Sequence, residues 1–224
     1  MKRLRSSGAL GLLLWLGLAG QGRAVDLYPT GPAEDAAFVR FVNAGPDRLQ
    51  IAPKGGGAPV ALDAPKQATP YYPVAAGGDI TGRLASDGAG QDIALKAAAG
   101  EFITVVAGAG QAPGIVVSVL REQPEDFTAV KASVAFYNMN AGCSPAAVQV
   151  AGRKVFLFES VAPDAMARRL VNPVKLALQL VCGGAPVGDP LELGRLEAGE
   201  RYSVFLAPGD PAARFFAVKD EVAN

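Results

Sequence analysis

The chain contains the run Ala99-Gly100-Glu101-Phe102-Ile103-Thr104-Val105 and, 99 residues later, the related run Ala198-Gly199-Glu200-Arg201-Tyr202-Ser203-Val204. An earlier pair matches in the same way, with Val39-Arg40-Phe41-Val42-Asn43 followed after 95 residues by Val134-Ala135-Phe136-Tyr137-Asn138. The order of the motifs and their spacing are thus kept in both halves. A chance match of two short strand patterns is the alternative, but the repeat favours a tandem of two similar domains.

Both halves consist of short apolar runs with a period of two, separated by glycine, proline, aspartate and asparagine at the spacing of a β-sandwich. Leu176, Leu178 and Leu180, for example, predict a half-buried strand with the leucines inward. The expected strands include residues 38–42, 92–96, 101–106, 175–180 and 202–206. No long helical period follows residue 24. We therefore predict an all-β chain of two tandem antiparallel β-sandwiches, of Ig-like or carbohydrate-binding-module-like type.

The first 24 residues have the pattern of a secretory signal peptide. Basic residues between Lys2 and Arg5 precede an apolar run from Ala9 to Leu18, and small residues end at Ala24. The apolar run is shorter than the roughly 18 residues that a membrane anchor needs, and Gln21 stands where lipidation would need cysteine. We expect residues 1–24 to be cleaved and the mature chain to be a periplasmic protein that does not span the membrane.

The remaining chain divides at a polar, proline-bearing segment. Glu122-Gln123-Pro124-Glu125-Asp126 has the composition of a linker. We predict an N-terminal β-sandwich over residues 25–121, a linker over residues 122–131 and a C-terminal β-sandwich over residues 132–224.

Composition disfavours several classes of function. Loss of the signal would leave 17 basic and 21 acidic side chains, a net charge of −4, which does not favour nucleic acid as a partner. The chain has no histidine, so a Ser-His-Asp or Cys-His arrangement has no base, and zinc loses its commonest ligand. The turn from Ser86 to Asp92 lacks the alternating carboxylates of an EF-hand loop. We predict no catalytic residue, metal or cofactor, although a glycosidase-like carboxylate pair stays open.

The two cysteines predict a structural disulfide. An even number of cysteines in an exported chain favours pairing. Cys182 has the same parity as Leu178 and Leu180, so its side chain should face the core, and Cys143 follows the strand that ends at Asn138. We expect Cys143 and Cys182 to be joined. Two separate buried thiols are the alternative, and a catalytic thiol is disfavoured because no histidine base exists.

Two short segments are candidates for a ligand or partner surface. Tyr71 and Tyr72 lie between prolines, and a pair of exposed rings could stack on a sugar. Arg168 and Arg169 form a basic doublet that could attract a polyuronate. The more ordinary interpretation gives Tyr71-Tyr72 one buried and one exposed ring, and places the arginines on a solvated strand face.

Two stretches carry a family resemblance. The first runs from Leu27-Tyr28-Pro29 through Phe38-Val39-Arg40 to Gly45, and the second is Val171-Asn172-Pro173-Val174-Lys175-Leu176-Ala177-Leu178. Both resemble the AlgF family of alginate O-acetylation proteins. The resemblance implies a periplasmic accessory protein that acts with the acetyltransferase-like proteins AlgJ and AlgX. The acidic net charge and the few aromatic rings predict at most weak contact with alginate. It supplies no catalytic residues. The alternatives are an alginate-binding module and, less favoured, an acetyltransferase with an unrecognised nucleophile.

Overall fold

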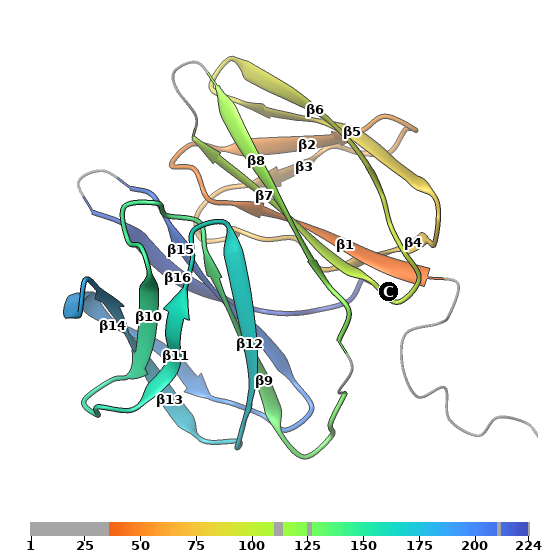
Figure 1. Cartoon of the computed structure of the whole chain (residues 1–224). Helices are drawn as coiled ribbons and strands as arrows, with labels where there is room; N and C mark the ends of the chain where they lie inside the picture. Colours follow the sequence, from red (N-terminus) through yellow and green to blue (C-terminus); the bar gives the residue numbers. More distant parts are fainter. Residues whose placement is uncertain (1–35, 110–113, 125–126, 210–211, 224) are drawn as a thin grey trace, which may run out of the picture. The chain divides into compact units, whose positions relative to one another are not determined.

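A computed structural model describes residues 36–109, 114–124, 127–209 and 212–223, all of which belong to a single structural unit (Figure 1). The predicted signal peptide, residues 1–24, lies outside the described residues. The first half contains β1 (Ala36–Asn43), β2 (Leu49–Pro53), β3 (Val60–Leu62), β4 (Tyr72–Ala75), β5 (Asp79–Ser86), β6 (Ala89–Lys96), β7 (Phe102–Ala109) and β8 (Ile115–Glu122). The second half contains β9 (Ala132–Asn138), β10 (Ala146–Val150), β11 (Phe156–Val161), β12 (Ala165–Val171), β13 (Lys175–Cys182), β14 (Ala185–Arg195), β15 (Arg201–Ala207) and β16 (Arg214–Lys219).

The strands form four sheets, two in each half. The first sandwich pairs the sheet β4-β1-β7-β8 with the sheet β3-β2-β5-β6. The second pairs β12-β9-β15-β16 with β11-β10-β13-β14, which is the same order with eight added to every strand number. The described residues contain strands and no helix, and therefore no helix suited to crossing a membrane. The predicted fold class, two tandem β-sandwiches, is confirmed.

The duplication extends to the register of the strands. Each sandwich is antiparallel except for one parallel pair, in which β1 lies beside β7 and β9 beside β15. Phe38 is opposite Phe102 in the first pair, and Ser133 is opposite Arg201 in the second. Ser133 and Arg201 lie 95 and 99 residues after Phe38 and Phe102, the same two spacings that relate the sequence motifs.

Each sandwich has an apolar core between its two sheets. Alternating residues supply it, as the period-two pattern predicts: Leu176, Leu178 and Leu180 are all buried. The buried core of the first sandwich consists of Ala37, Val39, Phe41, Leu49, Ile51, Leu62, Leu84, Ile93, Ala97, Ile103, Val105 and Ala107. That of the second consists of Ala132, Val134, Phe136, Cys143, Ala146, Val148, Phe158, Val161, Leu176, Leu178, Leu180, Leu196, Tyr202, Val204 and Leu206.

A third cluster joins the sandwiches. Its buried members come from both halves and are Val42, Ala44, Val106, Leu120, Ala135, Tyr137, Phe205 and Ala207. Residues of β1 and β7 therefore contact residues of β9 and β15. As a consequence every residue of β9 is buried, and so is every residue of β15 after Arg201. These two strands have one face in the core of their own sandwich and the other against the neighbouring sandwich.

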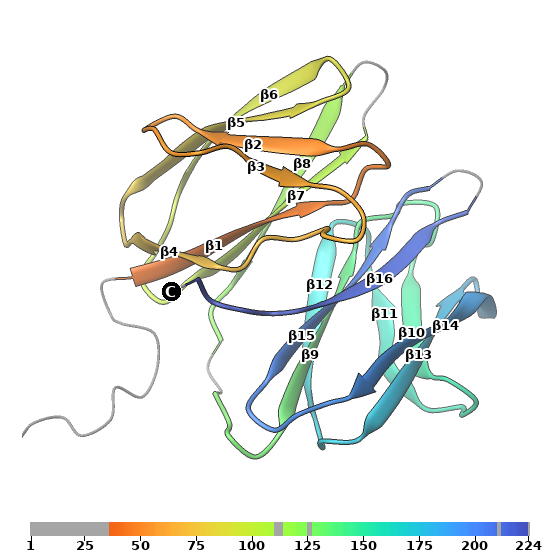
Figure 2. The same ribbon diagram turned by 180° about the vertical axis from the view of Figure 1, so that it is seen from behind.

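The chain returns to the first sandwich after its last strand. Residues 220–223, here called the C-terminal strap, run from the end of β16 to the segment just before β4 (Figure 2). The Tyr71 N–H donates to the Glu221 carbonyl at 2.7 Å, and the Ala223 N–H donates to the Tyr71 carbonyl at 2.8 Å. Val222 thus forms a parallel bridge with Tyr71. The strap is a backbone connection between the halves in addition to residues 122–131.

Candidate functional site

The contact between the sandwiches contains a buried arginine. Val39 and Phe41 of β1 point into the first core, so Arg40 between them points the opposite way, toward the second sandwich. Its side chain is 1% exposed. The guanidinium donates from Nη1 to Asp220 Oδ1 at 2.6 Å, and from Nη2 to Ser203 Oγ at 2.8 Å. Both acceptors belong to the second half of the chain.

Aromatic rings and hydroxyls complete the surroundings of Arg40. Its guanidinium lies 4.5 Å from the ring centre of Tyr71 and 5.5 Å from that of Tyr137, within the range of cation–π attraction. Nε donates to Thr104 Oγ1 at 3.0 Å, and Nη2 also donates to Tyr137 Oη at 3.2 Å. Burial lowers the pKa of Arg40, but the charge of Asp220, the hydroxyls of Tyr71 and Tyr137 and the hydrogen bond to Asp220 together outweigh burial, so the pKa is raised. Arg40 therefore stays positively charged.

Two further arginines surround the same carboxylates. Arg168 forms a bidentate ion pair with Glu122 and approaches Asp220 Oδ2 to 3.5 Å. Arg201 Nη2 lies 3.5 Å from Glu122 Oε1. These five residues (Arg40, Glu122, Arg168, Arg201 and Asp220) are called the interface network below. It contains three cations and two anions, and its members come from β1, β8, β12, β15 and the C-terminal strap.

The charges of the interface network shift the pKa values of its members in different directions. Burial raises the pKa of Asp220, but Arg40 and then Arg168 outweigh it, so the net pKa is lowered. For Arg168, burial lowers the pKa, but Glu122, Tyr137 and Asp220 together outweigh burial, so the pKa is raised. The pKa of Arg201 is lowered, first by burial and then by repulsion from Arg168. Arg201 is thus the least compensated of these cations.

The two predicted ligand segments occupy equivalent places in the repeats. Tyr72 is opposite Val39 in the first sandwich, and Arg169 is opposite Val134 in the second. Tyr71 and Arg168 therefore correspond, and both contact the interface network: Tyr71 lies over Arg40, and Arg168 pairs with Glu122. Tyr71 is 2% exposed, and burial raises its pKa.

Tyr72 and Arg169 do not form one surface with Tyr71 and Arg168. Tyr72 packs partly buried against the first core, whereas Arg169 is exposed. The structure thus brings Tyr71 and Arg168 into the contact between the sandwiches and leaves Tyr72 and Arg169 apart from it. Two stacked tyrosine rings on the surface are not available to a sugar.

The cysteines lie at one end of the second sandwich. Cys143, in the loop after β9, is joined to Cys182 at the end of β13, with their Cα atoms 5.2 Å apart. Cys143 is buried in the second core, and Cys182 packs partly buried against it. Asn138 supports the same loop, because its Nδ2 donates to the carbonyls of Cys143 and Val161.

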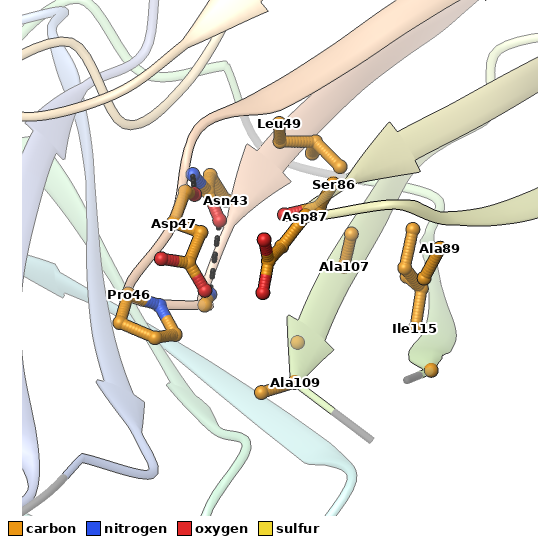
Figure 3. A pocket seen from close by; sticks show the side chains of 13 residues that line it. Asn43, Pro46, Asp47, Leu49, Ser86, Asp87, Ala89, Ala107, Ala109 and Ile115 are labelled. Carbon is orange, nitrogen blue, oxygen red and sulfur yellow. Dashed lines mark hydrogen bonds between the residues drawn. The ribbon is translucent and has the colours of Figure 1, made fainter. Parts of the chain in front are cut away.

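The corresponding end of the first sandwich is hollow. Asn43 has the role of Asn138, since its Nδ2 donates to the carbonyls of Asp47 and Leu62. A cavity of about 110 Å³ lies beside it, and Figure 3 shows the Asp47 and Asp87 carboxylates projecting into this space. Asp87 is placed there by the β5–β6 hairpin, whose two-residue turn has φ of 44° at Asp87 and 76° at Gly88. The second sandwich has its disulfide where the first has this hollow.

The interface network and the disulfide make contacts that stabilise the fold. Within the described ranges no group of three or more cysteine or acidic side chains is placed to hold a metal ion. The polar atoms around Arg40 are bonded to one another. Sequence reasoning missed Arg40, Glu122, Arg201 and Asp220 as site residues. The one available signal was the unbroken burial potential of the runs 134–137 and 204–207, which is typical of strands covered on both faces.

Comparisons with known proteins relate the chain to one family. The model of a family described as "Alginate O-acetyl transferase AlgF" matches residues 9–203. A Pseudomonas fluorescens protein named alginate biosynthesis protein AlgF is 28% identical over 178 residues, which cover 79% of this chain and 76% of that protein. The C-terminal domain of AlgF from P. aeruginosa is 26% identical, with a TM-score of 0.34 over 40% of this chain and 97% of that domain. A putative cell adhesion protein from Bacteroides ovatus is 10% identical, with a TM-score of 0.28 over 86% of this chain and 99% of that one.

Proposed function

This chain belongs to the AlgF family, and we propose that it is a periplasmic adaptor for alginate O-acetylation, which positions acetyltransferase partners and does not catalyse the transfer. The family description and the name of the P. fluorescens relative both refer to alginate. The proposed partners are the acetylation proteins AlgJ and AlgX. The proposed location follows from the signal-like pattern of residues 1–24.

The interface network is the observation that carries the adaptor role. Arg40 directs its hydrogen bonds to Thr104, Tyr137, Ser203 and Asp220, so its donors are used within the chain. Buried ion pairs often add little net stability, and we infer that this network instead fixes the geometry of the contact. Two sandwiches held at a fixed contact present their remaining surfaces in one arrangement. A preorganised surface loses less entropy when it binds a partner.

Co-purification tests this proposal. The full chain, tagged and returned to a strain that lacks it, is expected to retain AlgJ or AlgX from a periplasmic extract, and the strain to regain acetylated alginate. An Asp220→Asn variant should retain less of either partner, because it loosens the contact between the sandwiches. An exposed Asp92→Asn variant is the matched control. Acetylation that persists without the chain would contradict the adaptor role.

Assays on the purified chain separate the adaptor from the two alternatives. We expect no transfer or hydrolysis of acetyl groups above a heat-treated control, and turnover that is lost on changing one Ser, Thr or Asp would favour an enzyme. We also expect weak or no binding of oligomannuronate, since Tyr71 is buried and Arg168 is only 12% exposed. Submicromolar affinity with a steep salt dependence would favour an alginate-binding module.

A further inference from the structure

A second cavity lies beside Arg201, on the second sandwich. It has a volume of about 180 Å³. The residues around it include Phe127, Lys131, Ser133, Leu170, Glu200 and Arg201. They come from the segment before β9, from β9, from the end of β12 and from the start of β15. The cavity is called the Arg201 cavity below.

The rim of the Arg201 cavity is apolar and exposed. Phe127 is 46% exposed, Leu170 is 36% exposed, and nearby in sequence Val130 is 73% exposed. Single exposed apolar residues are ordinary, but an aromatic ring, a leucine and an arginine around one cavity have the composition of a protein-binding hot spot. The apolar side chains of the rim suit a polypeptide side chain better than a polyanionic sugar.

Arg201 supplies a polar group that its own chain does not satisfy. Its Nε and Nη2 are buried without a hydrogen-bond partner, and they are the only such side-chain atoms among the described residues. These two nitrogens share one edge of the guanidinium, the edge that a carboxylate can bridge with two hydrogen bonds. The nearest carboxylate, Glu122, lies 3.5 Å from Nη2 and is already held by Arg168 at both oxygens.

Comparison of the repeats shows that the equivalent strand position in the other sandwich does not carry an arginine. Phe102 occupies the place of Arg201 in the first sandwich, where it stacks on Phe38 at 4.6 Å and meets Tyr71 edge-on. The second sandwich has Arg201 at the equivalent position and Ser133 opposite it. The first sandwich thus has an aromatic cluster around Phe102, and the second has the positively charged Arg201 at the same place. An excess of buried positive charge is costly unless an anion joins it.

We propose that the Arg201 cavity is a docking site for a partner protein, whose segment inserts an apolar side chain beside Phe127 and Leu170 and pairs a carboxylate with Arg201. This inference rests on the proposed adaptor function and names its contact surface. The ring of Phe127 lies over the guanidinium, with its centre 5.4 Å away. Binding would require the half-exposed ring of Phe127 to move, because Nε and Nη2 of Arg201 are buried in the free chain.

A pair of model peptides tests the site. The full chain is titrated with N-acetyl-Leu-Glu-amide and with N-acetyl-Leu-Gln-amide, and NMR shifts at Phe127, Leu170 and Arg201 are followed. A charge-assisted bidentate contact predicts that the glutamate peptide binds about 10- to 100-fold more tightly. Arg201→Lys should remove most of this difference. Arg195→Lys, on exposed β14, is the matched control and should keep it.

Surface variants keep the test independent of folding. Leu170→Asp adds a negative charge at the exposed rim, so it should weaken binding of the glutamate peptide at least tenfold. Val155→Asp, at an exposed position elsewhere (57% against 36% for Leu170), should not. Equal affinity for both peptides, or tighter binding of oligomannuronate that Arg201→Lys abolishes, would overturn the inference. If the Leu170→Asp variant still retains AlgJ and AlgX, the proposed docking site is wrong, whereas the adaptor function stands. If the unaltered chain retains neither partner, the adaptor function itself is wrong.

Discussion

Replacing Asp220 by asparagine removes the carboxylate that contacts both Arg40 and Arg168 while keeping the shape of the side chain. The Asp220 side chain is 3% exposed, and its Oδ1 lies 2.6 Å from Arg40 Nη1. Asparagine can still meet the hydroxyl of Ser203, so the packing around residue 220 is retained. What is lost is the negative charge, and Arg40 is left buried without its counter-ion.

The expected cost is large for a change of one atom. Two unit charges about 4 Å apart attract by about 4 kcal/mol at an effective dielectric constant of about 20. Measured losses on breaking one partner of a buried pair are about 3–5 kcal/mol. We expect Asp220→Asn to lower the free energy of unfolding by a similar amount. Arg40→Met together with Asp220→Asn should cost less than the two single changes combined, because neither residue 40 nor residue 220 is then left as a charge without its partner.

Urea unfolding of the full chain, followed by far-UV circular dichroism, measures these values. The control is Asp92→Asn, which breaks an exposed pair with Arg83 whose side chains are 58% and 76% exposed at an N–O distance of 2.9 Å. Exposed pairs contribute about 0–1 kcal/mol. Similar losses for Asp220→Asn and Asp92→Asn, or additive losses for Arg40→Met and Asp220→Asn, would refute the account of the interface network.

Acid gives a second measurement on the same group. The pKa of Asp220 is lower in the folded chain than the ordinary value near 4. The ion pair therefore contributes its full stability above about pH 4, and this contribution is lost as the pH falls through the folded-state pKa. The difference in stability between the unaltered chain and Asp220→Asn should thus shrink in acid. A difference that stays constant from pH 7 to pH 2 would contradict the lowered pKa.

Two further predictions concern the ends of the sandwiches. Reduction of the Cys143–Cys182 bond, which spans 39 residues, should lower the stability of the second sandwich by about 4 kcal/mol and leave the first unchanged; urea unfolding with and without reductant measures this, and two thiols that label in the untreated protein would contradict the bond. Asn138→Ala should cost about 1–3 kcal/mol, because two carbonyls lose their donor, and Asn43→Ala should cost the first sandwich about as much; unchanged thermal midpoints would show that these asparagines do not support the loops.

Local patterns were sufficient to predict the sandwiches but not the contact between them. Strand positions follow from alternation, and the duplicated spacing follows from side chains that each repeat needs at the same place. The contact depends on pairs such as Arg40 and Asp220, which are 180 residues apart. A single arginine in an apolar strand has the same pattern whether water or a neighbouring sandwich covers it. Only a folded chain distinguishes the two.

The predicted ligand pairs show why site residues were harder to assign. Tyr71-Tyr72 and Arg168-Arg169 were selected because aromatic and basic doublets are common in binding surfaces. Equivalent register places their inner members beneath the opposing sandwich, where tyrosine and arginine pair with buried charges. The disulfide could be predicted from the sequence, because the inward orientation of Cys182 and the position of Cys143 after a strand both follow from neighbouring residues.

The C-terminal strap also limits the order in which contacts between the two sandwiches can form during synthesis. Synthesis proceeds from the N-terminus, so Arg40 exists long before Asp220, and the backbone of Tyr71 before that of Glu221. During that interval the first sandwich carries a guanidinium without its counter-ion on a surface shared with Val42. Its last contacts can form only when the end of the chain arrives, however early its own strands have paired. A chain released just before residue 220 would possess all sixteen strands and still be open at the contact that joins its halves.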